Sequence, residues 1–146
     1  MNAPGRVRLV GAAGRMGRAI VAAAEEDSGL TISGRAGRGD ALVPLLQDCD
    51  VVIDFSLPDA TAAVCAACVT SARPLVLGTT GHDEAQRKII RETAKKIPLV
   101  AAANFSLGVN TLFVLAREAA KSLGDNFEIE IVEAHQASYI ETAVED

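Results

Sequence analysis

The chain has 146 residues, of which 49% are hydrophobic and 23% charged, and its net charge is −5. This length and composition predict one globular domain with a sizeable core, and the negative charge with dispersed Lys and Arg argues against nucleic acid as the main partner. We find no secretory signal pattern and no apolar run long enough for a bilayer, and three cysteines form no disulfide framework. We therefore expect a cytoplasmic protein without a membrane partner.

The most informative stretch is a glycine-rich turn near the start. An apolar run at 7–10 leads into Gly11, Gly14 and Gly17, and an amphipathic run at 18–26 follows. This order is typical of the strand, turn and helix start of a dinucleotide-binding βαβ unit, in which first-turn N–H groups face phosphates. The spacing is a variant of the usual G-x-G-x-x-G, and a tight βα turn without a ligand is the alternative.

Short apolar runs then alternate with helical patterns. Strands are predicted at 30–33, 49–54, 74–77 and 99–101, with a loop at 34–40 and helices at 41–47, 58–70 and 83–96. A longer helix, capped by Ser106 or Asn110, is predicted to end near Lys121 and Gly124. This alternation predicts an α/β fold, a Rossmann-like doubly wound parallel sheet. A last strand at 127–133 has acidic alternate residues, which indicates an edge or the start of something outside the nucleotide fold.

Ligands of an open parallel sheet bind at the carboxyl ends of its strands. Arg35 and Arg38 follow the second strand, where arginine suits the 2′-phosphate of NADP, although both could be solvated loop residues. Small, hydroxyl and aromatic residues follow the next three strands, and each group also has a reading as turn chemistry. Together they predict a lined cleft, with Phe55 and Phe105 packing on the ligand's rings; the groups are 54–56, 78–80 and 102–106.

Cysteine and histidine give weaker signals. Cys65 and Cys68 fall inside a predicted alanine-rich helix without another Cys pair, so packing against the sheet is the default and no metal site is predicted. His82 is expected near a helix start on the surface. His135, just after the acidic strand, is by pattern alone more often structural or solvated than catalytic.

Five motifs, in order, resemble dihydrodipicolinate reductase (4-hydroxy-tetrahydrodipicolinate reductase), in particular its N-terminal nucleotide-binding domain. They cover nearly the whole chain, and the Ala-Asn-Phe-Ser and Glu-Ala-His stretches are quite specific. The motifs occupy residues 10–17, 52–56, 78–81, 102–110 and 130–135.

The resemblance implies reduction of the cyclic imine 4-hydroxy-tetrahydrodipicolinate by NAD(P)H, in lysine and diaminopimelate biosynthesis. It places Arg38 near the adenosine ribose, and Gly37 stands where the family usually has an acid, which favours NADPH, with NADH the alternative. His135 matches the proposed proton donor. The remaining implied cofactor-binding residues are Gly11, Ala12, Ala13, Gly14, Arg15 and Met16 for the pyrophosphate, and Phe55, Gly78, Thr79, Thr80, Ala103, Asn104, Phe105 and Ser106 around the nicotinamide.

The sequence also departs from the family. After His135 it reads Gln-Ala-Ser-Tyr-Ile, without the second histidine, the arginine, the lysine and the Gly-Thr segment that grips a dicarboxylate substrate. We expect a nucleotide-binding domain at 1–126 and the start or remnant of a substrate and oligomerisation domain at 127–146. An unpaired edge at 127–133 would favour a homo-oligomer.

Three interpretations follow: a reductase represented by a truncated chain, a catalytically incomplete NAD(P)-binding module, or a coenzyme A-binding module of the same fold. The two specific motifs count against the third.

Overall fold

The structure, a computed structural model, describes residues 3–124, 127, 128 and 130. It divides into two compact units, Met1–Phe105 and Ser106–Asp146. The boundary between compact units thus falls after Phe105, whereas the expected domain boundary lies after residue 126, and the assignment of the domains remains a prediction.

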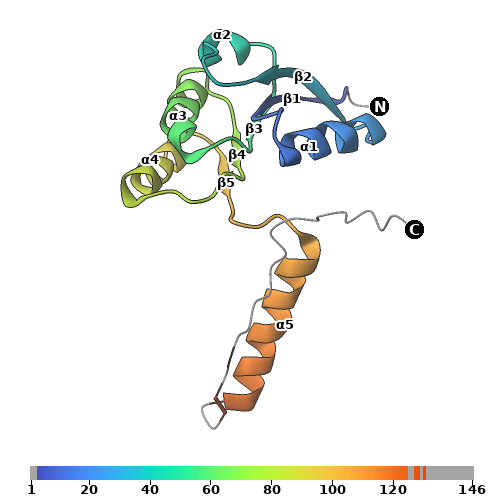
Figure 1. Cartoon of the computed structure of the whole chain (residues 1–146), viewed down its shortest axis with the longest axis vertical. Coiled ribbons are helices and arrows are strands. Elements are labelled where there is room, and N and C mark those ends of the chain that lie inside the picture. Colours follow the sequence, from blue (N-terminus) through green and yellow to red (C-terminus); the bar gives the residue numbers. More distant parts are fainter. Residues whose placement is uncertain (1–2, 125–126, 129, 131–146) are drawn as a thin grey trace, which may run out of the picture. The chain divides into compact units, whose positions relative to one another are not determined.

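The first unit is a five-stranded parallel sheet in the order β2-β1-β3-β4-β5 (Figure 1). This confirms the predicted α/β, Rossmann-like fold. Its elements in chain order are β1 Gly5–Val10, α1 Arg15–Glu26, β2 Leu30–Ala36, α2 Leu42–Leu45, β3 Val51–Asp54, the 3-10 turn η1 Pro58–Ala60, α3 Thr61–Thr70, β4 Leu75–Leu77, α4 Glu84–Ala94 and β5 Leu99–Ala101.

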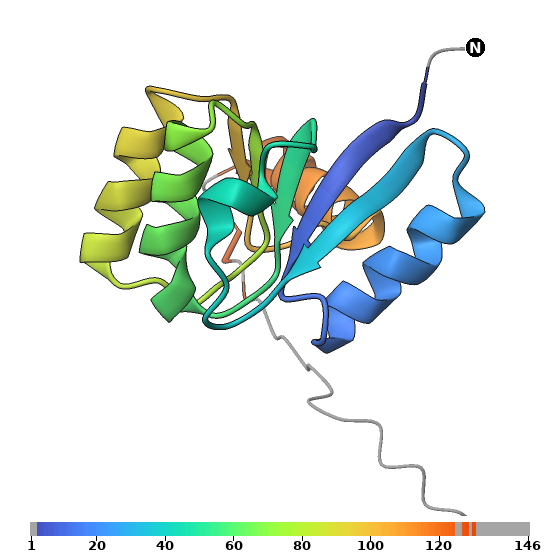
Figure 2. The ribbon, with the colours of Figure 1, turned by 90° about the horizontal axis from the view of Figure 1, so that it is seen from above.

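The helices form two layers. Figure 1 shows α1 on one side of the sheet and α2, α3 and α4 on the other. Because β1 lies between β2 and β3, the chain changes direction after β2, and right-handed crossovers then require the second helix layer. In Figure 2 the arrowheads of β1 and β2 point to the same edge, where the glycine turn joins β1 to α1.

The hydrophobic core lies between the sheet and the second helix layer. Cys65 and Cys68 are fully buried in it, as predicted for packing residues, and burial raises the pKa of the Cys68 thiol to about 12. The core cluster consists of Val10, Ala36, Leu46, Cys49, Val52, Val64, Cys65, Ala67, Cys68, Leu75, Leu77 and Ile97.

Strand β2 is longer than predicted, and the loop expected at 34–40 is wrong for its first three residues. The pairing of β1 with β2 shifts register between Val7 and Arg8, which places Arg8 opposite Gly34. A Cβ atom on Gly34 would overlap the guanidinium of the buried Arg8, whose other contact is an ion pair with Asp48. Gly34 is therefore a strand residue that makes room for a buried arginine, and it is not a loop signal.

Side chains cap two of the described helices at their starts. Asp83 accepts a hydrogen bond from Gln86 N (2.7 Å) and Gln86 Oε1 accepts one from Asp83 N (3.0 Å), so α4 begins with a capping box. In the second unit, α5 (Leu107–Leu123) has the predicted caps: Ser106 at its start and Gly124, with φ 69°, at its end.

Two predicted features fall outside the described part of the chain. Residues 129 and 131–133 of the predicted last strand are not described, and residues 127, 128 and 130 carry no strand assignment by themselves. His135 also lies outside the described residues. Among the residues that are described, no helix is long and apolar enough to cross a bilayer.

Candidate functional site

Two of the three glycines in the first turn are required by the backbone itself. Gly11 has φ 79°, and a Cβ atom there would lie 2.6 Å from Phe55 O. A Cβ atom on Gly17 would lie 2.3 Å from Gly11 O. Gly17 therefore packs against the turn, and both residues keep the turn tight.

Gly14 is different. A Cβ atom on Gly14 would have its nearest neighbour, Gly11 O, at 3.4 Å, which is ordinary contact, and the backbone angles (φ −72°, ψ 172°) suit any residue. Gly14 is the N-cap of α1, where no side chain caps the helix and no acidic residue occupies the first turn. The first-turn N–H groups, with the positive end of the helix dipole, are thus available to an anion.

The turn forms one wall of a groove of about 940 Å³. Arg35 and Arg38 also line it, and neither forms an ion pair within residues 3–124. Asp40 lines it too, but its Oδ2 accepts a hydrogen bond from Gly37 N (2.8 Å) and closes the loop after β2. The full lining is Val10, Gly11, Ala12, Ala13, Gly14, Arg35, Ala36, Gly37, Arg38, Gly39, Asp40, Leu42, Phe55, Ser56, Leu57, Asp59, Ala60, Ala63 and Val64.

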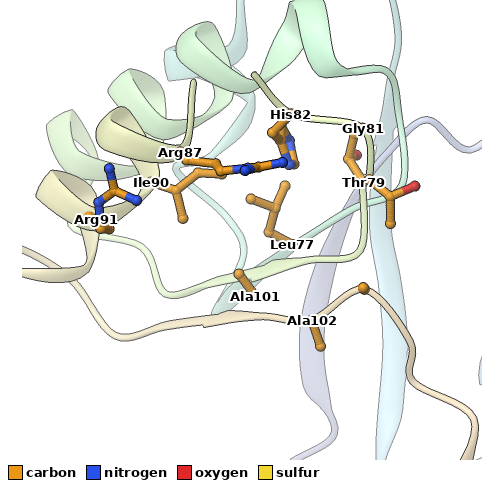
Figure 3. A pocket seen from close by; sticks show the side chains of 11 residues that line it. Leu77, Thr79, Gly81, His82, Arg87, Ile90, Arg91, Ala101 and Ala102 are labelled. Carbon is orange, nitrogen blue, oxygen red and sulfur yellow. The ribbon is translucent and has the colours of Figure 1, made fainter. Parts of the chain in front are cut away.

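A second cavity of about 410 Å³ lies at the carboxyl ends of β4 and β5. Leu77 and Ile90 line it, and Figure 3 shows the side chain of Arg87 extending from α4 toward His82. Arg91 donates a hydrogen bond to Glu84 (2.6 Å) and Arg87 lies 3.8 Å from the same carboxylate, so one acid is shared by two arginines. The other lining residues are Thr79, Thr80, Gly81, Ala101, Ala102 and Ala103.

The Phe55 side chain, which follows β3, contacts residues that follow β4 and β5. Its ring packs so closely on Gly78 that a Cβ atom there would lie 2.2 Å from the ring. The same ring contacts Phe105 edge to face, with centroids 5.8 Å apart. The two phenylalanines therefore pack on each other in this structure, a contact that the sequence did not indicate.

Asp54, the last residue of β3, is completely buried beside this cluster. Its Oδ1 accepts a hydrogen bond from Ser56 N (2.8 Å), whereas Oδ2 has no hydrogen-bond partner within the described residues. Burial raises the pKa of the Asp54 carboxyl, while Ser56, His82 and the Thr79 hydroxyl act in the opposite direction. Thr79 Oγ1 is itself buried without a hydrogen bond in the described part of the chain. Ser56 Oγ is likewise buried without one, so three such polar atoms lie at neighbouring strand ends in the described residues.

His82 is half-buried, and a hydrogen bond of 2.8 Å joins its Nε2 to Oγ1 of the fully buried Thr61. It was expected on the surface near a helix start, and it does precede the cap of α4, but it is anchored to α3. In the parts of the chain that the structure describes, no group of three or more His, Cys, Asp or Glu side chains is placed to hold a metal ion.

The structure brings most of the predicted site residues to these two cavities. Gly11, Ala12, Ala13, Gly14, Arg38 and Phe55 line the groove, and Thr79, Thr80 and Ala103 line the second cavity. Gly78 lies under the Phe55 ring, Arg15 and Met16 are exposed in the first turn of α1, and Ser106 caps α5. Asn104 and Phe105 belong to the loop after β5, outside both cavity linings.

Sequence reasoning missed the α3 side of the groove. Asp59, Ala60, Ala63 and Val64 line it from η1 and the first turn of α3. Their signal was the small residues at the start of that helix, directly after the strand end at Asp54. Arg87 and Arg91 of the second cavity were also missed, since basic residues on a helix are usually solvated.

Comparisons with known proteins agree with this geometry. Residues 5–105 match the family described as dihydrodipicolinate reductase, N-terminus. The chain is 42% identical over 135 residues to 4-hydroxy-tetrahydrodipicolinate reductase of Akkermansia muciniphila, covering 92% of this chain and 55% of that protein. It is 43% identical over 153 residues to the protein of the same name from Alkalilimnicola ehrlichii, covering 89% and 57%. The chain thus spans about half the length of these relatives.

A solved structure supports the fold. A dipicolinate-bound dihydrodipicolinate reductase from Paenisporosarcina sp. TG-14 superposes with a TM-score of 0.64 at 17% sequence identity, covering 80% of this chain and 53% of that one. At this identity the likeness is one of fold.

Proposed function

Since the chain belongs to the dihydrodipicolinate reductase family, we propose that it binds the cofactor for NAD(P)H-dependent reduction of the cyclic imine 4-hydroxy-tetrahydrodipicolinate in lysine and diaminopimelate biosynthesis. The family is one of pyridine nucleotide-dependent reductases. The proposal includes a preference for NADPH, the substrate and the catalytic residue.

The observation that carries the proposal is the open space at Gly14. Gly11 and Gly17 are required by the turn itself, whereas a Cβ atom on Gly14 would meet Gly11 O at 3.4 Å, which is ordinary contact. It lies at the uncapped start of α1 and lines the groove. A pyrophosphate in this space would accept hydrogen bonds from the N–H groups of the first turn, including those of Arg15 and Met16.

The end of β2 favours NADPH over NADH. Arg35 and Arg38 line the groove and have no acidic partner within residues 3–124, while the carboxylate of Asp40 is engaged by Gly37 N. A 2′-phosphate would give the two guanidinium groups a dianion, and Gly37 stands where the resemblance places the usual acidic acceptor for a ribose hydroxyl. Both observations favour NADPH over NADH.

The second cavity suits the nicotinamide end. Thr79, Thr80 and Ala103 line it at the ends of β4 and β5, beside the Phe55 ring on Gly78. When bound, a reduced nicotinamide supplies the hydride. The small residues would leave room for its ring, and the Thr80 side chain and the loop backbone would orient the carboxamide.

The proton donor is proposed from the resemblance. His135 matches the family's proton-donating histidine, and residues 127–146 would begin the domain that receives a small dicarboxylate and forms oligomers. We also propose a cytoplasmic location, in keeping with a soluble biosynthetic role.

Calorimetric titration of the purified chain with NADPH, NADH and coenzyme A, followed by an assay with the cyclic imine, tests the proposal. We expect NADPH to bind more tightly than NADH, and coenzyme A not to compete. Binding with turnover would support the full proposal, and binding without turnover would leave an NAD(P)-binding module. If coenzyme A alone binds, or no nucleotide does, the cofactor proposal is wrong.

A further inference from the structure

The carboxyl group of Asp54 lies between the two loops that form the proposed cofactor site. It is 0% exposed and so cannot touch a ligand. One oxygen, Oδ1, holds the turn after β3 through Ser56 N at 2.8 Å. The other, Oδ2, is buried with no hydrogen bond in the described residues, which is costly for a carboxylate oxygen unless a partner closes on it.

Thr79 is placed to be that partner. Asp54 is paired with Leu77 in the parallel register of β3 and β4, and Gly78 N donates to Asp54 O (2.8 Å). Thr79 lies in the loop after β4, directly after Gly78, whose N–H is bound to Asp54 O. Like the Ser56 hydroxyl, the Thr79 hydroxyl lowers the pKa of the carboxyl, yet neither hydroxyl oxygen has a hydrogen bond within residues 3–124.

The turn that Asp54 holds is part of the nucleotide groove. Phe55 and Ser56 line the groove, and Phe55 O is the atom that a Cβ atom on Gly11 would approach within 2.6 Å. The loop that carries Thr79 lines the second cavity, and a hydrogen bond between His82 and Thr61 fixes its far end. Asp54 thus contacts a wall of each cavity from inside the protein.

We propose that Asp54 is a positioning residue that couples the nucleotide half of the cofactor site to the nicotinamide half, with Oδ1 holding the turn at Ser56 and Oδ2 accepting the Thr79 hydroxyl when the cofactor binds. Hydrogen bonds in a site often tighten only in the complex. Because Asp54 would then hold both segments, the conformation of the loop after β4 would depend on that of the turn after β3. This inference rests on the proposed cofactor site.

A double-mutant cycle tests the coupling. NADPH affinity is measured by calorimetry for the wild type, Thr79→Val, Asp54→Ala and the double variant. Thr79→Val, which removes only a hydroxyl, is expected to weaken NADPH about tenfold in the wild type and less than about twofold in the Asp54→Ala background. Equal losses in both backgrounds would overturn the proposal, because Thr79 would then act without Asp54.

A half-cofactor separates coupling from general damage. Adenosine 2′,5′-bisphosphate occupies only the nucleotide half, so Thr79→Val is expected to change its affinity by less than about twofold. Thr79→Ser keeps the hydroxyl and is expected to retain NADPH affinity. Loss of binding of the half-cofactor in Thr79→Val, or failure of Thr79→Ser to bind as the wild type does, would contradict the inference.

Matched controls use residues away from the site. Thr93→Val removes another buried hydroxyl, in α4, and Asp50→Asn alters a carboxylate at the opposite end of β3; both are expected to leave NADPH affinity unchanged. If Asp54→Ala does not fold, Asp54→Asn, which keeps an acceptor for Ser56 N, replaces it under the same criterion. Absence of NADPH binding by the wild type would instead refute the proposed function.

Discussion

The two ends of the parallel strands differ in how many of their buried polar groups form hydrogen bonds. We call them the amino-end edge and the carboxyl-end edge of the sheet. At the amino-end edge, Arg6 binds Asp50 through two side-chain hydrogen bonds (2.8 and 3.3 Å), and Arg73 donates to the carbonyl oxygens of Leu46 and Gln47 (both 2.9 Å). At the carboxyl-end edge, three buried side-chain atoms have no hydrogen bond in the described residues: Asp54 Oδ2, Ser56 Oγ and Thr79 Oγ1.

The difference separates stability from binding. Turns at the amino-end edge are closed by the protein's own groups, with Ser71 Oγ a buried exception among the described residues, where Arg8 Nε, inside β1, is also buried without a hydrogen bond. The carboxyl-end edge keeps an uncapped helix start, two arginines without an ion pair within residues 3–124, and both cavities. Since buried polar groups are normally paired, the unpaired ones at the carboxyl-end edge mark loops that we expect to rearrange when a ligand binds.

Gly17→Ala is expected to have the largest effect. It tests whether a residue at the carboxyl-end edge also stabilises the fold. The new Cβ atom would lie 2.3 Å from Gly11 O, against backbone that cannot move aside. We expect a loss of about 3 kcal/mol in the free energy of unfolding, measured by urea denaturation. Gly14→Ala is the control and should unfold as the wild type does; equal stability of the two variants would contradict this account of the turn.

Gly14→Val separates binding from folding. Its side chain would occupy the space where the pyrophosphate is proposed, so we expect NADPH affinity to fall about 100-fold, measured by calorimetry. Because the backbone angles at Gly14 suit valine, the free energy of unfolding should stay within about 1 kcal/mol of the wild type. Unchanged NADPH affinity would refute the assignment of the turn to the cofactor.

Arg38→Ala tests whether this arginine, in the loop after β2, binds the 2′-phosphate. We expect NADPH affinity to fall about tenfold and NADH affinity to change little, because only NADPH carries a 2′-phosphate. Lys88→Ala removes a positive charge from α4 and serves as the control for a general effect of charge. If Arg38→Ala weakens both cofactors equally, Arg38 does not bind the 2′-phosphate.

Ala72→Gly tests the amino-end edge. Ala72 has φ 49° and closes α3 in a Schellman motif, with Ala72 N donating to Val69 O (3.2 Å) and Arg73 N to Cys68 O (2.9 Å). Glycine adopts this conformation without strain, so we expect a gain of about 0.5–1 kcal/mol in the free energy of unfolding. Cofactor affinity should not change, and a loss of stability would mean that the strain at Ala72 is negligible.

The smallest effect is expected at Asp50. Its hydrogen bonds with Arg6 lower the pKa of the Asp50 carboxyl from 3.8 to about 2. The stabilisation is thus present above about pH 4 and is lost as the pH falls toward 2. Asp50→Asn should lower the urea midpoint slightly at pH 5 and not at pH 2; a difference that persists at pH 2 would point to a cause other than the ion pair.

The sequence predicted local features better than contacts between distant segments. The spacing of Gly11, Gly14 and Gly17 after an apolar run, and the cap at Ser106, depend on neighbouring residues and were correctly identified. The extension of β2 through Gly34 depends on Arg8 in another strand. The contact of Phe55 with Gly78 and Phe105 likewise forms only when three strand ends meet, so no local pattern indicates it.

Hydrogen exchange of the backbone amides with and without NADPH tests whether the glycine-rich turn holds the cofactor, because it locates the ligand as well as detecting it. We predict that NADPH protects the amides of residues 11–18, where the first turn of α1 meets the phosphates, and those of residues 35–40 beside Arg38. Protection at Thr79 and Thr80 should follow at the second cavity. Binding of NADPH without protection at residues 11–18 would contradict the account.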